Sequence, residues 1–357
     1  MNALGFGKNV TGGGPSPTRI AVTQAANTGS GSLANAIGLA NANSRADASL
    51  HQEIVIGSPG SALTVKANDT NLVVTARNLT IRAIGGAVIR RNHLVFDCAS
   101  ADNIILRDLS FDSDGTSDPE DCITIDGRVG RQPTGFWIDH CSFEAFRDMC
   151  ITSYTRDLPG QAPPLLISIS SCRFNDRNPS GTASFNHGAV GIYGATKHFP
   201  DDTRTNTYAT IYGNYFRHTR RRSPRSTQLT LVHAFNNVLD EWGSTIATEL
   251  QQNGMASGNF GLLVAVANYF QAGRLKEAIE VAGGKKPARL SVPARGARVN
   301  QYRNDAIPAV LVGQRIALLR QYASGLGTGT VPPRGDPMTD ALAQTIRNTA
   351  GARVTAA

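Results

Sequence analysis

Charged and aromatic residues are scarce in this sequence, and their scarcity limits the class of fold. Of the 357 residues, 17% are charged and 6% are aromatic, whereas charged residues make up about a quarter of an average globular protein. This composition disfavours a helical bundle, a coiled coil and a long disordered chain. The 36 glycines instead favour many short strands joined by tight turns.

Three further features are missing. No apolar run approaches the length of a membrane span, so we expect no transmembrane helix. The segment Met1–Gly14 lacks the apolar core of a secretory signal, so we expect a protein that is not exported or one whose leader has been removed. The five cysteines do not form the CxxC pairs typical of metal sites, and their odd number leaves at least one thiol outside any disulfide within the chain.

The charge that is present is mostly positive. Lysine and arginine outnumber aspartate and glutamate by 35 to 27, which gives a formal net charge of +8. Such a balance favours an anionic partner, and an acidic polysaccharide, a nucleic acid or a membrane surface would each fit. The composition alone does not distinguish these three.

A β-rich pattern that ends in a large apolar residue recurs along the chain at intervals of roughly 30 residues, the period of a solenoid. The two-residue alternation within each unit predicts strands rather than helices. Short strands such as Cys122–Ile125 and Cys150–Thr152 lie between the units. Two or three strands per turn, stacked in parallel, predict an all-β protein with a right-handed parallel β-helix. The units are Leu106–Phe111, Trp137–Phe143, Ser168–Phe174, Thr210–Phe216, Val232–Val238 and Val264–Phe270.

The same alignment predicts one column of stacked side chains, two residues before each terminal apolar residue. Asparagines in this column would form an amide ladder, and Cys141 and Cys172 would be neighbours. Cys122 and Cys150 would be neighbours in a second column. We expect stacked thiols rather than disulfides at these pairs, because a disulfide requires a specific orientation. The column contains Leu109, Cys141, Cys172, Asn214, Asn236 and Asn268.

The ends of a solenoid need caps. The helical spacing of Ser32–Ser44 predicts an N-terminal capping helix. After about Gln271 the composition changes, and helix-like runs follow at Ala309–Tyr322 and Thr339–Asn348. We therefore expect a β-helix domain over residues 1–272 and, over residues 273–357, a C-terminal tail with short helices packed on the solenoid.

Several motifs make the sequence resemble the pectate and pectin lyases of polysaccharide lyase family 1. The resemblance extends over most of residues 4–272, and WIDHCS is its most specific motif. It implies the parallel β-helix fold and cleavage of galacturonan by β-elimination. The motifs are Gly5–Gly13 (GFGKNVTGG), Gly31–Ile37 (GSLANAI), Asp121–Asp126 (DCITID), Trp137–Ser142 (WIDHCS), Asn214–Pro224 (NYFRHTRRRSP) and Leu231–Val238 (LVHAFNNV).

β-Elimination on a uronan requires a base at C5, neutralisation of the C6 carboxylate and positive groups that hold the polyanion. The resemblance implies that the base is the first arginine of an R-x-P-x-x-R pattern, which is Arg222 here. The nearby Arg225 is a candidate for substrate binding. Thr227 replaces the second arginine of the pattern, as in pectin lyases. From spacing alone, this basic cluster could also bind a polyanion without any chemistry.

The resemblance also implies a calcium site, which is incomplete in this sequence. Asp121 matches the first ligand and Asp148 the second, while Thr152 stands where a third aspartate is expected. Asp118 and Glu120 could supply further oxygens, since Ca²⁺ takes six to eight. The same acidic residues could equally be ordinary turn and strand-capping residues. Pectin lyases do without the ion and place an arginine nearby, which would be Arg147 here.

A third departure concerns a lysine that pectate lyases carry before an apolar strand. Ala189 stands at the expected position. His187 and Lys197 lie nearby and are candidates for substrate binding.

Asp139 and His140 look catalytic at first sight. On a regular strand, however, adjacent side chains point to opposite faces, so these two residues should not form a dyad. We interpret WIDHCS as part of a structural polar network.

The favoured hypothesis is a secreted, monomeric lyase that acts on pectate or pectin, with an acidic polysaccharide as its partner and neither nucleic acid nor membrane. The alternative is a non-catalytic or tailspike-like protein that binds acidic polysaccharides through the same fold. A nucleic-acid-binding protein lacks a recognition motif here. A glycoside hydrolase would need paired carboxylates. Asp112, Asp114, Asp118 and Asp121 are candidates, but no hydrolase signature accompanies them.

Overall fold

The computed structural model describes most of the chain, with gaps between the described segments. The described residues are 3–66, 71–113, 121–127, 134–144, 148–155, 164–175, 188–194, 207–219, 221–227, 230–243, 254–258, 261–271, 278–282, 289–291, 300–303, 336–351 and 353.

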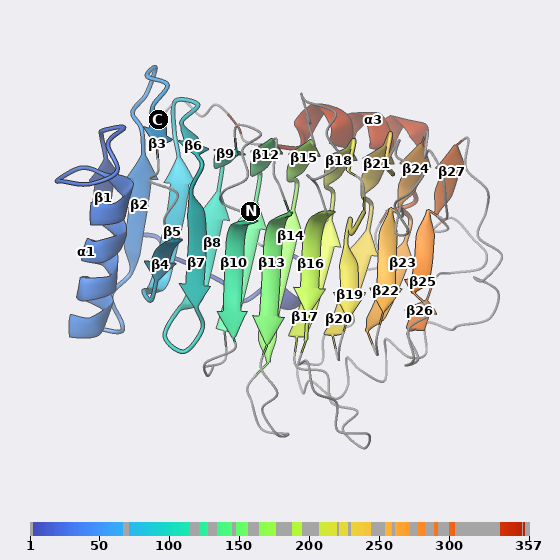
Figure 1. Cartoon of the computed structure of the whole chain (residues 1–357), viewed down its shortest axis with the longest axis horizontal. Helices are drawn as coiled ribbons and strands as arrows, with labels where there is room; N and C mark the ends of the chain where they lie inside the picture. The colour runs from blue at the N-terminus through green and yellow to red at the C-terminus, as the bar shows by residue number, and fades with distance from the viewer. Residues whose placement is uncertain are drawn as a thin grey trace.

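Strands of successive turns pair in parallel and form three long sheets (Figure 1). The ten-stranded sheet has the order β1 (Thr18–Val22), β2 (Gln52–Ile56), β5 (Arg77–Ala83), β8 (Asp102–Arg107), β11 (Thr134–Asp139), β14 (Leu165–Ser170), β17 (Thr207–Tyr212), β20 (Thr230–Phe235), β23 (Leu262–Val266) and β26 (Arg289–Ser291).

The other two sheets repeat this arrangement. The eight-stranded sheet has the order β4 (Asn71–Val74), β7 (His93–Asp97), β10 (Asp121–Gly127), β13 (Met149–Thr155), β16 (Gly188–Tyr193), β19 (Arg225–Thr227), β22 (Met255–Gly258) and β25 (Ile279–Ala282). The nine-stranded sheet has the order β3 (Thr64–Lys66), β6 (Val88–Arg90), β9 (Ser110–Asp112), β12 (Ser142–Glu144), β15 (Arg173–Asn175), β18 (Tyr215–Arg217), β21 (Val238–Asp240), β24 (Tyr269–Gln271) and β27 (Gln301–Arg303).

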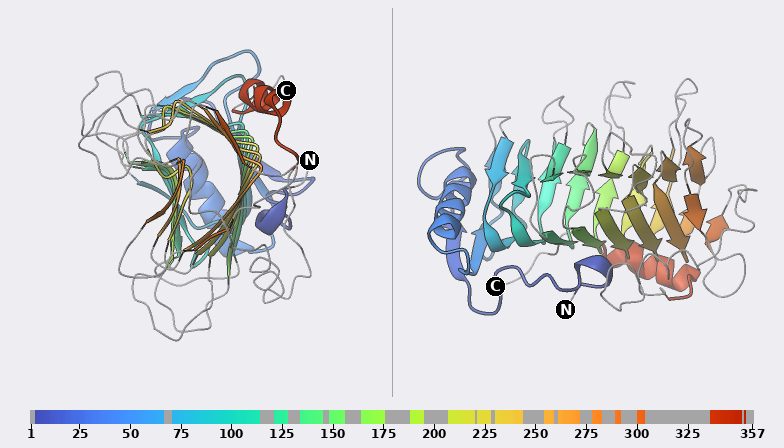
Figure 2. Two further views of the ribbon diagram at one scale, coloured as in Figure 1. Left: turned by 90° about the vertical axis from the view of Figure 1, so that its right-hand side faces the viewer. Right: turned by 90° about the horizontal axis from the view of Figure 1, so that it is seen from below.

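The three sheets enclose one apolar core, as the view along the solenoid shows (Figure 2). The fold is the expected parallel β-helix. A column of four stacked phenylalanines runs through the core, with ring centroids 5.2, 4.9 and 4.7 Å apart, close to the spacing of neighbouring strands. The column consists of Phe111, Phe143, Phe174 and Phe216.

The predicted amide ladder exists, with one change of register. The Nδ2 of each asparagine donates to the Oδ1 of the next, at 3.0, 2.9 and 3.0 Å. The alignment assigned Asn236 to the column, but the residue in the ladder is Asn237, because Phe216 pairs with Leu239 rather than Val238. Asn236 has a left-handed backbone (φ 50°) and instead binds the backbone of Asp336. The ladder contains Asn214, Asn237, Asn268 and Asn300.

Thiols occupy the preceding positions of the same column. The backbone N–H of Cys141 donates to the Sγ of Cys172 at 3.4 Å, and Cys172 in turn donates its N–H to Asn214. All five cysteines are buried and none is in a disulfide. The expectation of stacked thiols is confirmed for Cys141 and Cys172.

The expected N-terminal cap is present. Helix α1 (Leu33–Ala46) begins after Ser32, whose hydroxyl accepts a hydrogen bond from the N–H of Asn35. The helix buries Leu33 and Ile37 against the first turns and closes that end of the core (Figure 1).

The C-terminal helix is also found. Helix α3 (Asp340–Thr349) lies along the solenoid and packs Ala343 and Ile346 against aromatic residues of the sheets. The helix expected at 309–322 falls outside the described residues. Strands β25, β26 and β27 lie beyond residue 272, so the sheets continue past the expected boundary. The division into two domains stays a prediction.

The N-terminal segment crosses the outer face of the ten-stranded sheet. A 3-10 turn, η1 (Gly5–Gly7), lies against it. The N–H groups of Leu4, Phe6 and Gly7 donate to side chains of β17 and β14. Gly7 is required for this close approach, because a Cβ there would lie 2.7 Å from the carbonyl oxygen of Phe136.

Within the described part of the chain, neither helix is long and apolar enough to cross a bilayer.

A buried histidine makes the stability depend on pH. His233 of β20 is 2% exposed, and burial lowers its pKa to about 4, against about 6.5 in an unfolded chain. Between these values the unfolded chain binds more protons, so acid lowers the free energy of unfolding. We expect His233 to contribute a loss of about 2 kcal/mol between about pH 7 and pH 5.

Urea unfolding at both pH values, for the wild type and His233→Gln, measures this contribution. The variant should lose less stability than the wild type on acidification. Equal losses in the two proteins would show that His233 does not titrate as expected.

Candidate active site

The site lies on the outer face of the eight-stranded sheet. Alternation along its strands sends Ile123, Ile125 and Ile151 into the core and leaves Thr124 and Thr152 on the outside. The parallel register then aligns outward residues of successive strands in two rows. The first row is Thr124, Thr152, Gly191, Arg225 and Ala256, and the second is Asp126, Tyr154, Tyr193, Thr227 and Gly258.

Arg222 lies just before β19, at the edge where these strands begin. Its backbone has φ 59° and its carbonyl accepts a hydrogen bond from Val190. Its Nη1 lies 3.4 Å from Asp148 Oδ1 and 3.5 Å from Met149 Sδ. The side chain is 17% exposed, so the guanidinium is held in place rather than free in solvent.

Gly188 makes room for this arginine. Gly188 is in register with Met149, and a Cβ at this position would lie 2.5 Å from both the Arg221 carbonyl oxygen and the Arg222 Cβ. The absence of a side chain therefore lets Arg222 lie across the start of β16. Ala189, which stands at the expected lysine position, is fully buried in the core. A lysine there would not reach the outer face.

Asp121 lies at the start of β10, next to this pair. Its Oδ1 accepts a hydrogen bond from the N–H of Met149 at 3.2 Å, and its Oδ2 accepts one from the Thr124 hydroxyl at 3.3 Å. Burial raises the pKa of Asp121 to about 6, and the charge of Asp148 adds to the rise, against the effect of the Thr152 and Thr124 hydroxyls.

The hydroxyl of Thr124 continues a chain of contacts away from Asp121. It lies 2.8 Å from His93 Nε2, and His93 Nδ1 lies 2.9 Å from Asn71 Oδ1. Burial lowers the pKa of His93 to about 4, so the ring is neutral at pH 7. Neither Thr124 nor His93 was predicted as a site residue from the sequence, although the alternation of DCITID places Thr124 on the outer face.

Two tyrosines extend the site along the second outward row. Tyr154 and Tyr193 are stacked, with ring centroids 5.5 Å apart. Arg222, Arg225, Asp148 and Asp121 all act on the Tyr193 phenol, whose pKa is raised mainly by burial. Tyr193 was also missed, since no motif marks it.

The predicted site residues that the structure describes thus come together. Arg222, Asp121 and Asp148 share one region of the outer face, and Arg225 lies in the adjacent row. Their roles in binding and catalysis stay predictions. Five other predicted residues lie outside the described part of the chain: Asp118, Glu120, Arg147, His187 and Lys197.

Comparisons with known proteins identify the family. A family model described as pectate lyase matches residues 7–281, which is most of the chain. The chain belongs to the pectate lyase family. No curated protein matches the sequence.

Solved pectate lyases share the right-handed β-helix. One bound to a hexasaccharide superposes with a TM-score of 0.65 at 15% identity, covering 98% of both chains. Another, from Paenibacillus sp. 0602, gives 0.59 at 15% identity and covers 100% of this chain and 97% of its own. A third, from Bacillus sp. N165 in complex with trigalacturonate, gives 0.55 at 16% identity, with coverage of 95% and 96%. Identity this low shows the fold alone.

The described residues of this pectate lyase family member do not by themselves form a calcium site. They bring no group of three or more acidic, histidine or cysteine ligands together. Asp121 and Asp148 offer two carboxylates, and Asp148 is already paired with Arg222. Calcium takes six to eight oxygen ligands, so no step is assigned to the ion.

The WIDHCS motif begins at the end of β11 in the ten-stranded sheet and runs into β12 of the nine-stranded sheet, so it is not on the sheet that carries this site. Asp139 accepts a hydrogen bond from Ser170 at 2.7 Å and is paired with Arg107 at 3.3 Å. The prediction that Asp139 and His140 lie on opposite faces is wrong. His140 has a left-handed backbone (φ 50°), which ends the alternation and places its Nδ1 2.9 Å from Asp139 Oδ2.

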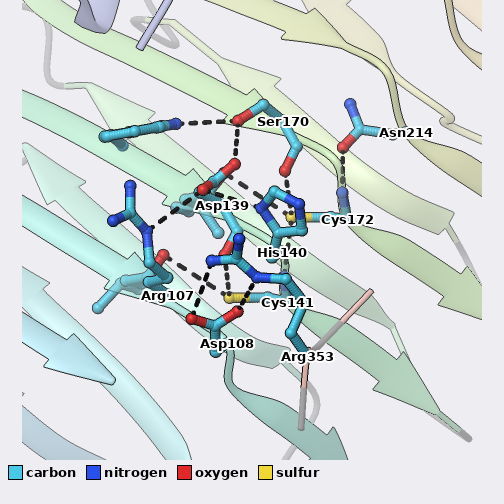
Figure 3. A network of polar contacts seen from close by, with 12 residues as sticks. Arg107, Asp108, Asp139, His140, Cys141, Ser170, Cys172, Asn214 and Arg353 are labelled. Atoms are coloured by element: carbon cyan, nitrogen blue, oxygen red, sulfur yellow. Dashed lines mark hydrogen bonds and ion pairs between the residues drawn. The ribbon is translucent and has the colours of Figure 1, made fainter. Parts of the chain in front are cut away.

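This pair is nevertheless part of a structural network. Ser170 also accepts a hydrogen bond from the Trp137 indole, and the Arg107 guanidinium lies 4.5 Å from the centre of the Trp137 ring. Next to it, Arg353 of the C-terminal segment makes two hydrogen bonds to the buried Asp108 (Figure 3). The network therefore ties the C-terminal segment to the sheet.

Proposed function

We propose that this protein is a polysaccharide lyase that cleaves pectate or pectin by β-elimination. The observation that carries the proposal is the position of Arg222. It matches the family's base pattern, and it lies on the outer face of the eight-stranded sheet beside Asp148, with Asp121 next to them.

In the proposed reaction the neutral form of Arg222 takes the proton at C5 of a galacturonate unit, next to the C6 carboxyl group. The electrons of the C5–H bond form the C4–C5 double bond, and the C4 oxygen leaves. Arg225 is paired with Gly191 on the neighbouring strand, on the outer face, and would bind a carboxylate of the polyanion.

Because the substrate is a polymer outside the cell, we propose that the protein acts after secretion.

Calcium stays part of the proposal as a prediction. If an ion binds, Asp121 and Asp148 would be two of its ligands, and the described residues bring no third acidic, histidine or cysteine ligand to them. In the proposed reaction the arginines of the site supply the positive charge that neutralises a substrate carboxylate.

An ultraviolet assay for unsaturated uronide tests the proposal. The substrates are polygalacturonate and highly methylated pectin, each with Ca²⁺ and with a chelator. We expect product from at least one substrate, and the effect of the chelator decides whether calcium is needed. The absence of product under all four conditions would overturn the proposed function.

A polysaccharide-binding protein without activity is the second candidate. Two observations favour this candidate. Arg222, the proposed base, is already paired with Asp148, and Thr227 replaces the second arginine of the family pattern. Binding of oligogalacturonate without any product would support this alternative.

A further inference from the structure

The ring of Tyr193 lies folded over Gly191. A Cβ built on Gly191 would be 2.4 Å from Cε2 and 2.9 Å from Cζ of Tyr193. The far half of the ring, which carries the hydroxyl, therefore covers this glycine and points back toward the start of the strand. Any side chain at position 191 would displace the ring.

This direction brings the hydroxyl into the site. Gly191 has Arg225 as its neighbour on β19 and Thr152 as its neighbour on β13. The Met149 Cε would lie 2.8 Å from the same added Cβ, and the Met149 Sδ is 3.5 Å from Arg222 Nη1. The phenol thus lies among the groups that surround Arg222.

The local electrostatics suit a group that holds a proton and can release it. Burial raises the pKa of the Tyr193 phenol, so it is protonated at neutral pH. The charges of Arg222 and Arg225 act in the other direction and favour a phenolate, while those of Asp148 and Asp121 oppose it more weakly. The stacking on Tyr154, with an angle of 16° between the rings, fixes the orientation.

We propose that Tyr193 is the proton donor to the leaving C4 oxygen in the elimination, an inference that rests on the proposed lyase function. The C4–O bond breaks, its electron pair stays on the oxygen, and the Tyr193 hydroxyl supplies the proton. Arg222 has gained the C5 proton in the same turnover. Transfer of one proton from the guanidinium to the phenolate, directly or through water, restores both groups, so no further reactant is needed.

The first test compares two tyrosines that differ in position. Tyr193→Phe keeps the ring and its stacking but removes the proton, and general acid catalysis contributes about 10²- to 10⁴-fold. We expect kcat on polygalacturonate to fall within this range while KM changes little. Tyr215→Phe, on β18 of the nine-stranded sheet, is the control and should retain wild-type kcat. Wild-type turnover by Tyr193→Phe would overturn the proposal.

The second test removes the need for an acid. In a synthetic galacturonate that carries 4-nitrophenol at O4, the leaving phenolate departs without protonation. Tyr193→Phe should release nitrophenolate at a rate close to that of the wild type, whereas Arg222→Ala should be strongly slowed on both substrates. An equal loss on both substrates in Tyr193→Phe would contradict a role as proton donor. If the wild type itself forms no unsaturated product from the polymer, the proposed function fails and this inference with it.

Discussion

Replacement of Arg222 by alanine is expected to lower kcat/KM on polygalacturonate by about 10²- to 10⁴-fold, the contribution of a positioned base. The guanidinium lies against Asp148 and Met149, and no other described residue matches the base position of the family. The variant should fold normally, because the ion pair with Asp148 is partly exposed, and such pairs contribute about 1 kcal/mol or less. The ultraviolet product assay measures the effect.

Arg217→Ala is the matched control for this variant. Arg217 also forms an ion pair, with Glu241 at 3.1 Å, but it belongs to β18 of the nine-stranded sheet. Its replacement should leave kcat/KM unchanged. Activity of Arg222→Ala within a few-fold of the wild type would show that another group is the base.

The Asn237→Ala variant is expected to lose about 3–5 kcal/mol of stability, since each buried polar group left without a partner costs about 1–3 kcal/mol. The side chain is fully buried. Its Oδ1 accepts hydrogen bonds from the N–H and the Nδ2 of Asn214, and its Nδ2 donates to Ile211 and Asn268. Alanine would remove all four of these hydrogen bonds, two of them from Asn214. Chemical unfolding measures the change.

The exposed Asn348 of α3 provides the comparison. Its Oδ1 accepts a hydrogen bond from Gln344, and water can replace this bond, so Asn348→Ala should change the stability by about 0.5 kcal/mol or less. If the two alanine variants were equally stable, the asparagine ladder would not contribute the expected free energy of unfolding.

The periodicity of the sequence predicted the β-helix because each turn repeats one strand with a large apolar end. It did not fix the register of one turn. Asn236 and Asn237 are adjacent and chemically identical, and only the pairing of Phe216 with Leu239 shows which of them enters the ladder. The motifs likewise predicted Arg222, Asp121 and Asp148, since the family pattern contains these residue types.

Other features of the site depend on conformation and could not be read from residue types. The left-handed backbone at His140 reverses the expected direction of its side chain, and no local pattern around this histidine marks it. Tyr193 enters the site because Gly191 leaves space for its ring, which requires the three-dimensional register of β16 with its neighbours. His93 reaches Thr124 from another turn of the solenoid.

The segment that crosses the ten-stranded sheet bears on the order of events during synthesis. Leu4 binds Tyr212 and Phe6 binds Thr210, which lie 208 and 204 residues further along the chain, so these partners leave the ribosome well after the segment itself. Residues 4–7 must therefore wait until β14 and β17 form, and contacts between such distant parts of a chain slow folding. The docking of residues 4–7 thus follows the formation of the polar rows that they cover.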